Sequence, residues 1–146
     1  MRTKSDAQKY LERVELIDTI VKNKLIEQLQ WRDLAESITA NMGGERVQSS
    51  GSMSRMADAV NKCIDMEGQI ACEVDKLAAE KQEITATIEQ MDNPTWYNLL
   101  HMRYIQFKSL QEIADHYGKE YDWATTTHGR AIQSLQSILD REEINR

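Results

Sequence analysis

The chain has 146 residues, which allows one domain or two small ones and leaves no room for the core of a large enzyme. It holds one proline and one phenylalanine among many Leu, Ile, Ala, Glu, Gln and Lys residues, a composition typical of an all-α protein. The formal net charge of −6 argues against a nucleic-acid binder that depends on bulk attraction. Most of this acidity lies in residues 1–93, because residues 94–146 carry six Lys or Arg against seven Asp or Glu.

The N-terminal segment lacks the apolar core of a signal peptide, and no apolar run of about 18 residues occurs anywhere in the chain. Cys63 and Cys72 lie nine residues apart on one expected helix. Their separation of about 13 Å along the helix exceeds the reach of a disulfide. We therefore expect a soluble, cytoplasmic protein with free thiols and no membrane contact.

The first expected helix has apolar positions that alternate four and three apart from residue 10 to residue 38, as in a heptad seam. The seam consists of Tyr10, Val14, Ile17, Val21, Lys24, Gln28, Trp31, Ala35 and Ile38. Leu16, Ile20 and Leu34 widen the apolar face on one side. This pattern predicts a long helix that packs against a partner helix.

A second seam with the same spacing runs from residue 56 to residue 91: Met56, Val60, Cys63, Glu67, Ile70, Val74, Leu77, Lys81, Ile84, Ile88 and Met91. The simplest arrangement is a long antiparallel helical hairpin, a coiled coil, over residues 1–93 with a loop at about 39–54. In that register Lys24 comes level with Glu67. The two side chains would form an ion pair that fixes the register, or both would extend to the edge of the seam.

The loop between the two helices allows two interpretations. Gly43, Gly44, Arg46, Ser49, Ser50, Gly51 and Ser52 offer amides, hydroxyls and a cation to a phosphate, although their spacing matches no P-loop. In the other interpretation the loop is a connection in which Ser52 or Ser54 caps the second helix. A contact with a partner protein is compatible with either interpretation.

The sequence Asp92-Asn93-Pro94 must end the second helix, since proline removes a hydrogen-bond donor and disfavours helical geometry in the residue before it. Asp92 or Asn93 can cap the next helix, and Pro94 suits its first turn. That helix would end near Gln106, with a buried face formed by Trp96, Leu99, Leu100 and Tyr104. We place the domain boundary here, between residues 1–93 and 94–146.

The segment from Ser109 to Leu139 has the spacing of a helix-turn-helix. Its first helix would bury Ile113, Ala114 and Tyr117, and Gly118 would adopt the left-handed conformation that ends this helix. The second helix would bury Ala124, Thr127 or His128, Ala131, Leu135 and Ile138. Lys119 and Thr127 stand where apolar residues are usual, so an ordinary corner of two helices remains an alternative.

The outward face of the second helix would enter the major groove of double-stranded DNA. We assign Thr125, Thr126, Arg130, Tyr121 and Gln133 to contacts with DNA in the groove, and Lys108, Ser109 and Lys119 to phosphate contacts. Trp123 either packs inside the protein or contacts DNA or a partner. Gly129 is costly inside a helix, which is explained by close approach of a neighbouring helix or of the DNA backbone.

The other residues do not point to catalysis. His101, His116 and His128 form no ligand set with the cysteines, and neither CxxC nor HExxH occurs. The chain has no serine elbow, Walker loop or dinucleotide fingerprint. We expect no enzyme activity, no cofactor and no metal.

The segment from Asn93 to Leu139 resembles region four of sigma factors, the helix-turn-helix that reads promoter DNA. The whole chain is similar to a family of small sigma-factor-like regulators of phages and prophages in Gram-positive bacteria. The strings that carry this resemblance are Arg46 to Ser52, Met56 to Val60, and His128 to Ala131. The resemblance implies a three-helix, sigma-like DNA-binding domain in a phage protein that acts in the cytoplasm of a bacterial host cell.

The leading hypothesis is a sequence-specific DNA-binding transcription regulator of phage genes, which acts as a homodimer through its coiled-coil half or together with RNA polymerase. The alternative is an adaptor that binds RNA polymerase or its sigma factor and never contacts DNA. A third hypothesis is a DNA-packaging component similar to a small terminase subunit. In such subunits the DNA-binding part commonly comes first, which is the reverse of the order expected here.

Overall fold

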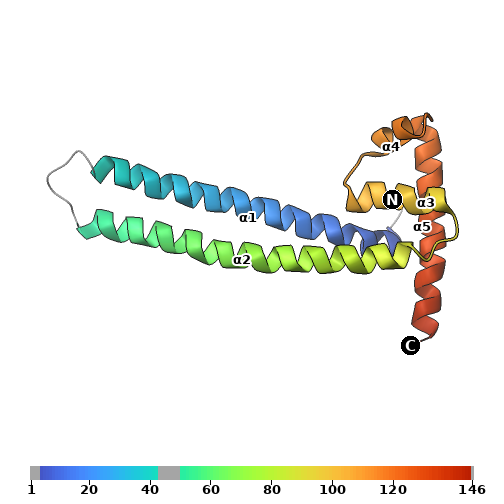
Figure 1. Ribbon diagram of the computed structural model, residues 1–146, viewed down its shortest axis with the longest axis horizontal. Helices are drawn as coiled ribbons and strands as arrows, with labels where there is room; N and C mark the ends of the chain where they lie inside the picture. The colour runs from blue at the N-terminus through green and yellow to red at the C-terminus, as the bar shows by residue number, and fades with distance from the viewer. Residues whose placement is uncertain (1–3, 43–49, 146) are drawn as a thin grey trace. The chain divides into compact units, whose positions relative to one another are not determined.

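The computed structural model describes residues 4–42 and 50–145, and this part of the chain contains helices and no strand (Figure 1). The elements are α1 (Asp6–Met42), α2 (Ser50–Ile88), α3 (Pro94–Leu100), the π-helical η1 (His101–Ile105), α4 (Leu110–His116) and α5 (Tyr121–Ile144). The predicted all-α class is confirmed. Of the helices described, none is long and apolar enough to cross a membrane.

The chain divides into two compact units, which we describe separately. The terminal unit comprises Met1–Leu16 and Leu77–Arg146, and the helix-pair unit comprises Ile17–Lys76. The division falls within α1 and α2 and not at Pro94. Residues 1–16 and 77–93 therefore belong to the same compact unit as α3, α4 and α5.

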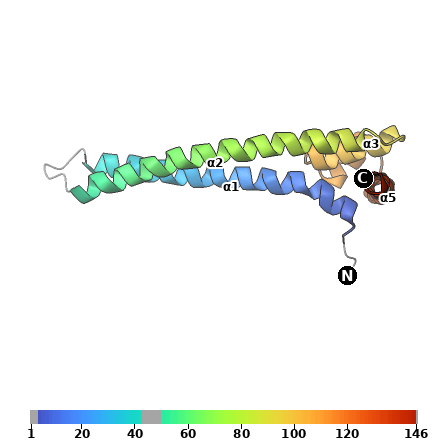
Figure 2. The same ribbon diagram turned by 90° about the horizontal axis from the view of Figure 1, so that it is seen from below.

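In the helix-pair unit, α1 and α2 run antiparallel, side by side (Figures 1 and 2). Gln28 donates from Nε2 to the Cys63 carbonyl oxygen at 3.1 Å, and Thr39 contacts the Met56 sulfur at 3.1 Å. Lys24 donates to the Gln69 side chain at 2.8 Å. The expected ion pair of Lys24 with Glu67 is thus replaced by a hydrogen bond to the amide two residues further along α2.

The seam of α1 lies as the spacing predicts, since every residue assigned to it from Ile17 to Ile38 is buried or half-buried. The seam of α2 differs. Val60, Glu67 and Val74 are exposed, and the inward positions are Met56, Ala59, Cys63, Met66 and Ile70. Spacings of three and four can follow each other in either order, so Ala59 and Val60 both continue the sequence pattern. The small, fully buried Ala59 occupies the inward position.

The connection between the two long helices is shorter than expected, because α1 extends to Met42 and α2 begins at Ser50. Ser52 and Ser54 lie inside α2, so the predicted capping role of either residue is wrong. Of the residues in the phosphate interpretation of this loop, Gly43, Gly44, Arg46 and Ser49 lie outside the described residues, whereas Ser50, Gly51 and Ser52 lie in α2.

The core of the terminal unit joins both ends of the chain. Leu11 and Val14 of α1 and Ile84 and Ile88 of α2 are fully buried in one cluster with Leu99, Leu100, Ile113, Ala131 and Leu135. The backbone N–H of Ala7 donates to Gln136 Oε1 at 2.9 Å, which satisfies one of the free donors at the start of α1. The first turn of α1 is thereby fixed to α5.

The break predicted at Asn93-Pro94 is present. The Asn93 side chain accepts hydrogen bonds from the N–H groups of Thr95 and Trp96 at 3.0 and 3.2 Å, and Pro94 occupies the first turn of α3. Beyond α3 the helix continues as η1 to Ile105, close to the end predicted at Gln106. Leu99, Leu100 and Tyr104 are buried as expected, whereas Trp96 is half-buried.

Candidate nucleic-acid interface

Helix α4 begins with a reciprocal cap. Ser109 Oγ accepts from the Glu112 N–H at 3.1 Å, and the Glu112 carboxylate accepts from the Ser109 N–H at 3.3 Å. The Ser-x-x-Glu signature of this capping box is visible in the sequence, so Ser109 has a capping role besides the phosphate contact predicted for it. Because its amide is already paired and a carboxylate occupies the helix start, Ser109 contributes less to anion binding than its position suggests.

The turn between α4 and α5 depends on Gly118. Gly118 has a φ of 64°, the left-handed conformation that was predicted for it. Its N–H donates to the Asp115 carbonyl oxygen at 3.1 Å, and the Lys119 N–H donates to that of Ala114 at 2.8 Å. These are the two bonds of a Schellman motif. The exposed Lys119 follows the glycine, so its side chain can remain charged outside the core.

Helix α5 has one buried face and one exposed face. The buried residues are Ala124, Thr127, Ala131, Ile132, Leu135 and Ile138, as the spacing predicts apart from the additional Ile132. This face packs against α3 and α4. The exposed residues include Tyr121, Thr125, Thr126, Arg130 and Gln133. The structure thus leaves five of the eight predicted DNA contacts exposed on one helix.

The other three predicted contacts come from the segments that flank α4. Lys108 and Ser109 precede α4, and Lys119 lies in the turn before α5. Phe107, next to Lys108, has a φ of 60°, which is unusual for a bulky residue. Its ring lies 5.2 Å from the Lys81 ammonium, and the Lys108 carbonyl oxygen accepts from Arg103 at 3.2 Å. These contacts anchor the connection between η1 and α4.

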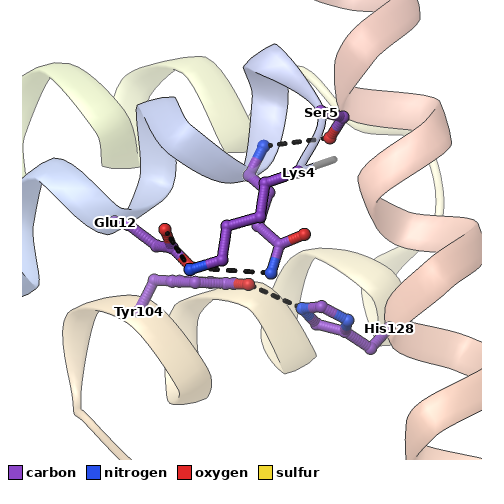
Figure 3. Close-up of polar contacts among 6 residues, drawn as sticks. Lys4, Ser5, Glu12, Tyr104 and His128 are labelled. Carbon is purple, nitrogen blue, oxygen red and sulfur yellow. Dashed lines mark hydrogen bonds and ion pairs between the residues drawn. The ribbon is translucent and has the colours of Figure 1, made fainter. Parts of the chain in front are cut away.

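Polar contacts hold α4 and α5 on the supporting helix. Asn98 Nδ2 in α3 donates to the Tyr117 hydroxyl at 2.7 Å, and the Tyr104 hydroxyl in η1 lies 2.6 Å from His128 Nε2 in α5 (Figure 3). The Trp123 ring lies 5.3 Å from the Tyr117 ring and is half-buried. Trp123 therefore takes part in packing between α4 and α5, as one of the two interpretations proposed.

Burial governs the protonation of the Tyr104 and His128 pair. It lowers the pKa of His128 below its ordinary value, an effect that the nearby Arg103 charge increases and that Glu12 opposes. Burial also raises the pKa of the Tyr104 hydroxyl well above its ordinary value. Near Tyr104, Glu12 forms an ion pair with Lys4 at 2.9 Å (Figure 3). At neutral pH the pair is an uncharged phenol bonded to an uncharged imidazole.

Gly129 lies in the middle of α5 on its exposed side. Apart from the adjacent residues and the backbone of α5 itself, a Cβ built at this position would meet no atom of the described residues within 4 Å. Close approach of a neighbouring helix of the same chain, one of the two explanations considered for this glycine, is therefore wrong. The surface at this point is unobstructed and carries no side chain.

The charges around the exposed face of α5 are nearly balanced. Lys119 and Arg130 are exposed cations, but Glu120 and Asp122 stand between them at the start of the helix. The exposed Thr125 donates its hydroxyl hydrogen to the Tyr121 carbonyl oxygen at 3.1 Å, which leaves its oxygen as an acceptor. The face combines small, aromatic, amide and charged groups without a strong net charge.

Within residues 4–42 and 50–145, no group of three or more His, Cys, Asp or Glu side chains is arranged to hold a metal ion. Comparison with protein-family models, with curated proteins and with solved structures gave no match. The resemblance to sigma region four therefore stays a prediction from the sequence.

Proposed function

We propose that the protein is a sequence-specific DNA-binding transcription regulator in which α4 and α5 form a sigma-like helix-turn-helix. The observation that carries the proposal is the exposed face of α5. It holds Tyr121, Thr125, Thr126, Arg130 and Gln133 around Gly129, which no contact among the described residues explains. A glycine in a helix interior costs about 1 kcal/mol relative to alanine. Because Gly129 has no Cβ, a second molecule such as a DNA backbone can approach α5 closely at this point.

The side chains on this face suit a major groove. Arg130 can bond to guanine or to phosphate, and Gln133 can bond to adenine through its amide. The Thr126 hydroxyl and the Thr125 oxygen can bond to base edges, and their methyl groups can contact thymine methyls. Lys119 lies in the turn that precedes α5, where it can reach a phosphate.

Binding by a single copy would be weak. Lys108 and Lys119 are the cations we assign to phosphate, and Arg130 can add a third phosphate contact where it does not bond to guanine. Each neutralised phosphate releases about 0.9 counterion. Glu120 and Asp122 oppose this attraction. We therefore propose that two copies, or one copy together with RNA polymerase, hold the recognition helix on DNA. This fits the phage regulators that the sequence resembles.

The proposal is tested by selecting duplexes from a randomised pool with the purified full chain. Enriched duplexes are then titrated with the wild-type chain and with the double variant Thr126→Ala and Arg130→Ala. Both residues are exposed and outside the core, so the variant should fold normally. We expect the selected sequence to lose its advantage over a shuffled duplex. Undiminished preference in the folded double variant would refute the assignment of these residues to base contacts.

A second candidate is an adaptor that binds RNA polymerase or its sigma factor without DNA. The acidic groups Glu112, Glu120 and Asp122, all exposed near the start of α4 and α5, favour this alternative. The same selection separates the two candidates. An adaptor would enrich no duplex but would bind the isolated polymerase. The substitution Asp122→Lys would then weaken the binding to polymerase.

A further inference from the structure

The helix-pair unit carries a groove that the proposed function does not use. It has a volume of about 600 Å³ and a floor formed by Trp31, Leu34 and Ile38 of α1. Its edge on α2 consists of Arg55, Asp58, Asn61, Lys62 and Asp65. Leu34 is 45% exposed, although its side chain is entirely apolar. The groove therefore presents an apolar surface beside a row of charged groups.

The charges along this edge follow a regular order. Arg55, Asp58, Lys62 and Asp65 are spaced three and four apart, so they line one side of α2 and alternate positive, negative, positive, negative. All four side chains are exposed. Among the described residues, no ion pair or hydrogen bond engages the Asp58, Lys62 or Asp65 side chain. These charges are available to a partner.

This order of charges is complementary to the same order read in the opposite direction along the helix. When two copies of α2 lie antiparallel across a two-fold axis, Asp58 of each copy faces Lys62 of the other. Arg55 then faces Asp65 in the same way. Both pairs have their midpoint at residue 60, so a single axis serves all four contacts. A two-fold interface requires this relation, in which one residue contacts a second and the second contacts the first.

The position of Trp31 agrees with the same axis. Gln28 bonds to Cys63, Lys24 to Gln69 and Thr39 to Met56 across the antiparallel pair, so Trp31 lies level with residues 60 to 64 of α2. The half-buried indole thus lines the groove close to the axis. Interfaces concentrate their binding energy in central aromatic residues that are surrounded by a polar rim.

We propose that this groove is the surface on which a second copy of the chain docks, with the two α2 helices antiparallel about residue 60. This face would be the one through which two copies associate when they bind DNA. Only the role of the dimer in DNA binding rests on the proposed function, and the formation of the dimer does not. Association is measured without DNA, so its failure would leave DNA binding by one copy untouched. Failure of DNA binding would likewise leave the dimer intact.

The sharpest test is rescue between two variants. Lys62→Asp and Asp58→Lys each replace two attractive contacts of the symmetric dimer with two repulsive ones. We expect each variant alone to raise the dimer dissociation constant at least about tenfold, since facing like charges disfavour association. An equimolar mixture restores both attractive contacts across the axis and should recover the wild-type affinity. A change confined to the stability of α2 itself would not be rescued by mixing.

Sedimentation or light scattering up to about 100 µM detects dimers of even weak affinity. Circular dichroism checks that each variant keeps its helices. If either single variant folds poorly, the variant that carries both substitutions replaces it in the test, because its swapped charges again attract across the axis and it should dimerise. Glu67→Lys, an exposed substitution outside the groove lining, is the matched control and should leave association unchanged. A monomeric wild-type chain at these concentrations would overturn the proposal, as would a dimer that neither reversal weakens.

Cross-linking gives an independent measurement of the same geometry. Asn61→Cys places a thiol next to the axis, so mild oxidation should produce a disulfide-linked dimer. The native Cys72 lies 12 residues from residue 60, about 18 Å along the helix, so the two Cys72 residues of a dimer would be about 36 Å apart. The unsubstituted chain should therefore not cross-link through Cys72. Cross-linking through Cys72 would contradict the antiparallel arrangement.

Discussion

Replacement of Gly129 by alanine should separate stability from function. The position is helical, exposed and free of neighbours within 4 Å, so a Cβ meets no obstacle inside the chain. Alanine restricts the unfolded chain and favours the helix, which should raise the free energy of unfolding by about 0.5 to 1 kcal/mol. DNA affinity should instead fall at least about tenfold, which corresponds to about 1.4 kcal/mol, because the added methyl group lies where the DNA backbone approaches.

Gly68→Ala is the matched control. Gly68 lies inside α2 in the helix-pair unit and also has no neighbour within 4 Å of a Cβ. It should gain similar stability and leave DNA binding unchanged. Urea unfolding measures the first effect, and fluorescence anisotropy with a selected duplex measures the second. If Gly129→Ala binds DNA as tightly as the wild-type chain does, the exposed face of α5 is not held close to a DNA backbone, and the reasoning is refuted.

Three further predictions address the terminal unit and its charges. Leu11→Ala should lower the free energy of unfolding by about 2 to 5 kcal/mol, because Leu11 is fully buried. Leu16 is 62% exposed, so Leu16→Ala should change it by no more than about 0.5 kcal/mol. Equal effects of the two substitutions in urea unfolding would contradict the shared core. Burial lowers the pKa of His128, so the unfolded chain binds more protons than the folded chain as the pH falls. The contribution of His128 to the free energy of unfolding is therefore complete above pH about 6.5, and it is lost as the pH falls below that value. His128→Gln should therefore flatten the pH dependence of unfolding by up to about 1.4 kcal/mol per pH unit, and parallel curves for the two proteins would count against a buried neutral imidazole. The logarithm of DNA affinity should fall with that of salt concentration with a slope of about −3 per bound copy, and Lys119→Ala should reduce the slope by about one. An unchanged slope would remove Lys119 from the phosphate contacts.

The sequence predicts the local structure of the C-terminal region well. The left-handed Gly118, the cap at Asn93 and the buried face of α5 follow from the chemistry of a few residues, and all three are present. Each depends on interactions between residues that are close in the chain. Spacing and capping rules describe such interactions directly.

Contacts between distant segments could not be read from the same patterns. Leu11 packs in a core with residues beyond Pro94, and Ala7 bonds to Gln136, yet the heptad pattern that begins at Tyr10 includes neither residue. A heptad seam indicates that a helix is covered without identifying the covering element. The spacing also could not distinguish Ala59 from Val60 as the inward residue of α2, because both continue a pattern of threes and fours.

The candidate site was predicted in part. The exposed positions on α5 follow from helical periodicity, whereas the capping role of Ser109 was overlooked despite the Ser-x-x-Glu spacing with Glu112. The bond of Tyr104 to His128 joins two residues 24 apart in sequence, and no local signal marks it. Partial burial of Trp123 against Tyr117 likewise depends on how α4 and α5 cross.

The most direct test of the proposed function is the ratio of the affinities of the full chain for a selected duplex and for a shuffled duplex of equal composition. The measurement is made at a fixed salt concentration, because affinities for DNA cannot be compared otherwise. Recognition by α5 predicts that the selected duplex binds at least about tenfold more tightly and that Thr126→Ala with Arg130→Ala removes the difference. Equal affinities for both duplexes in the wild-type chain would contradict sequence-specific recognition.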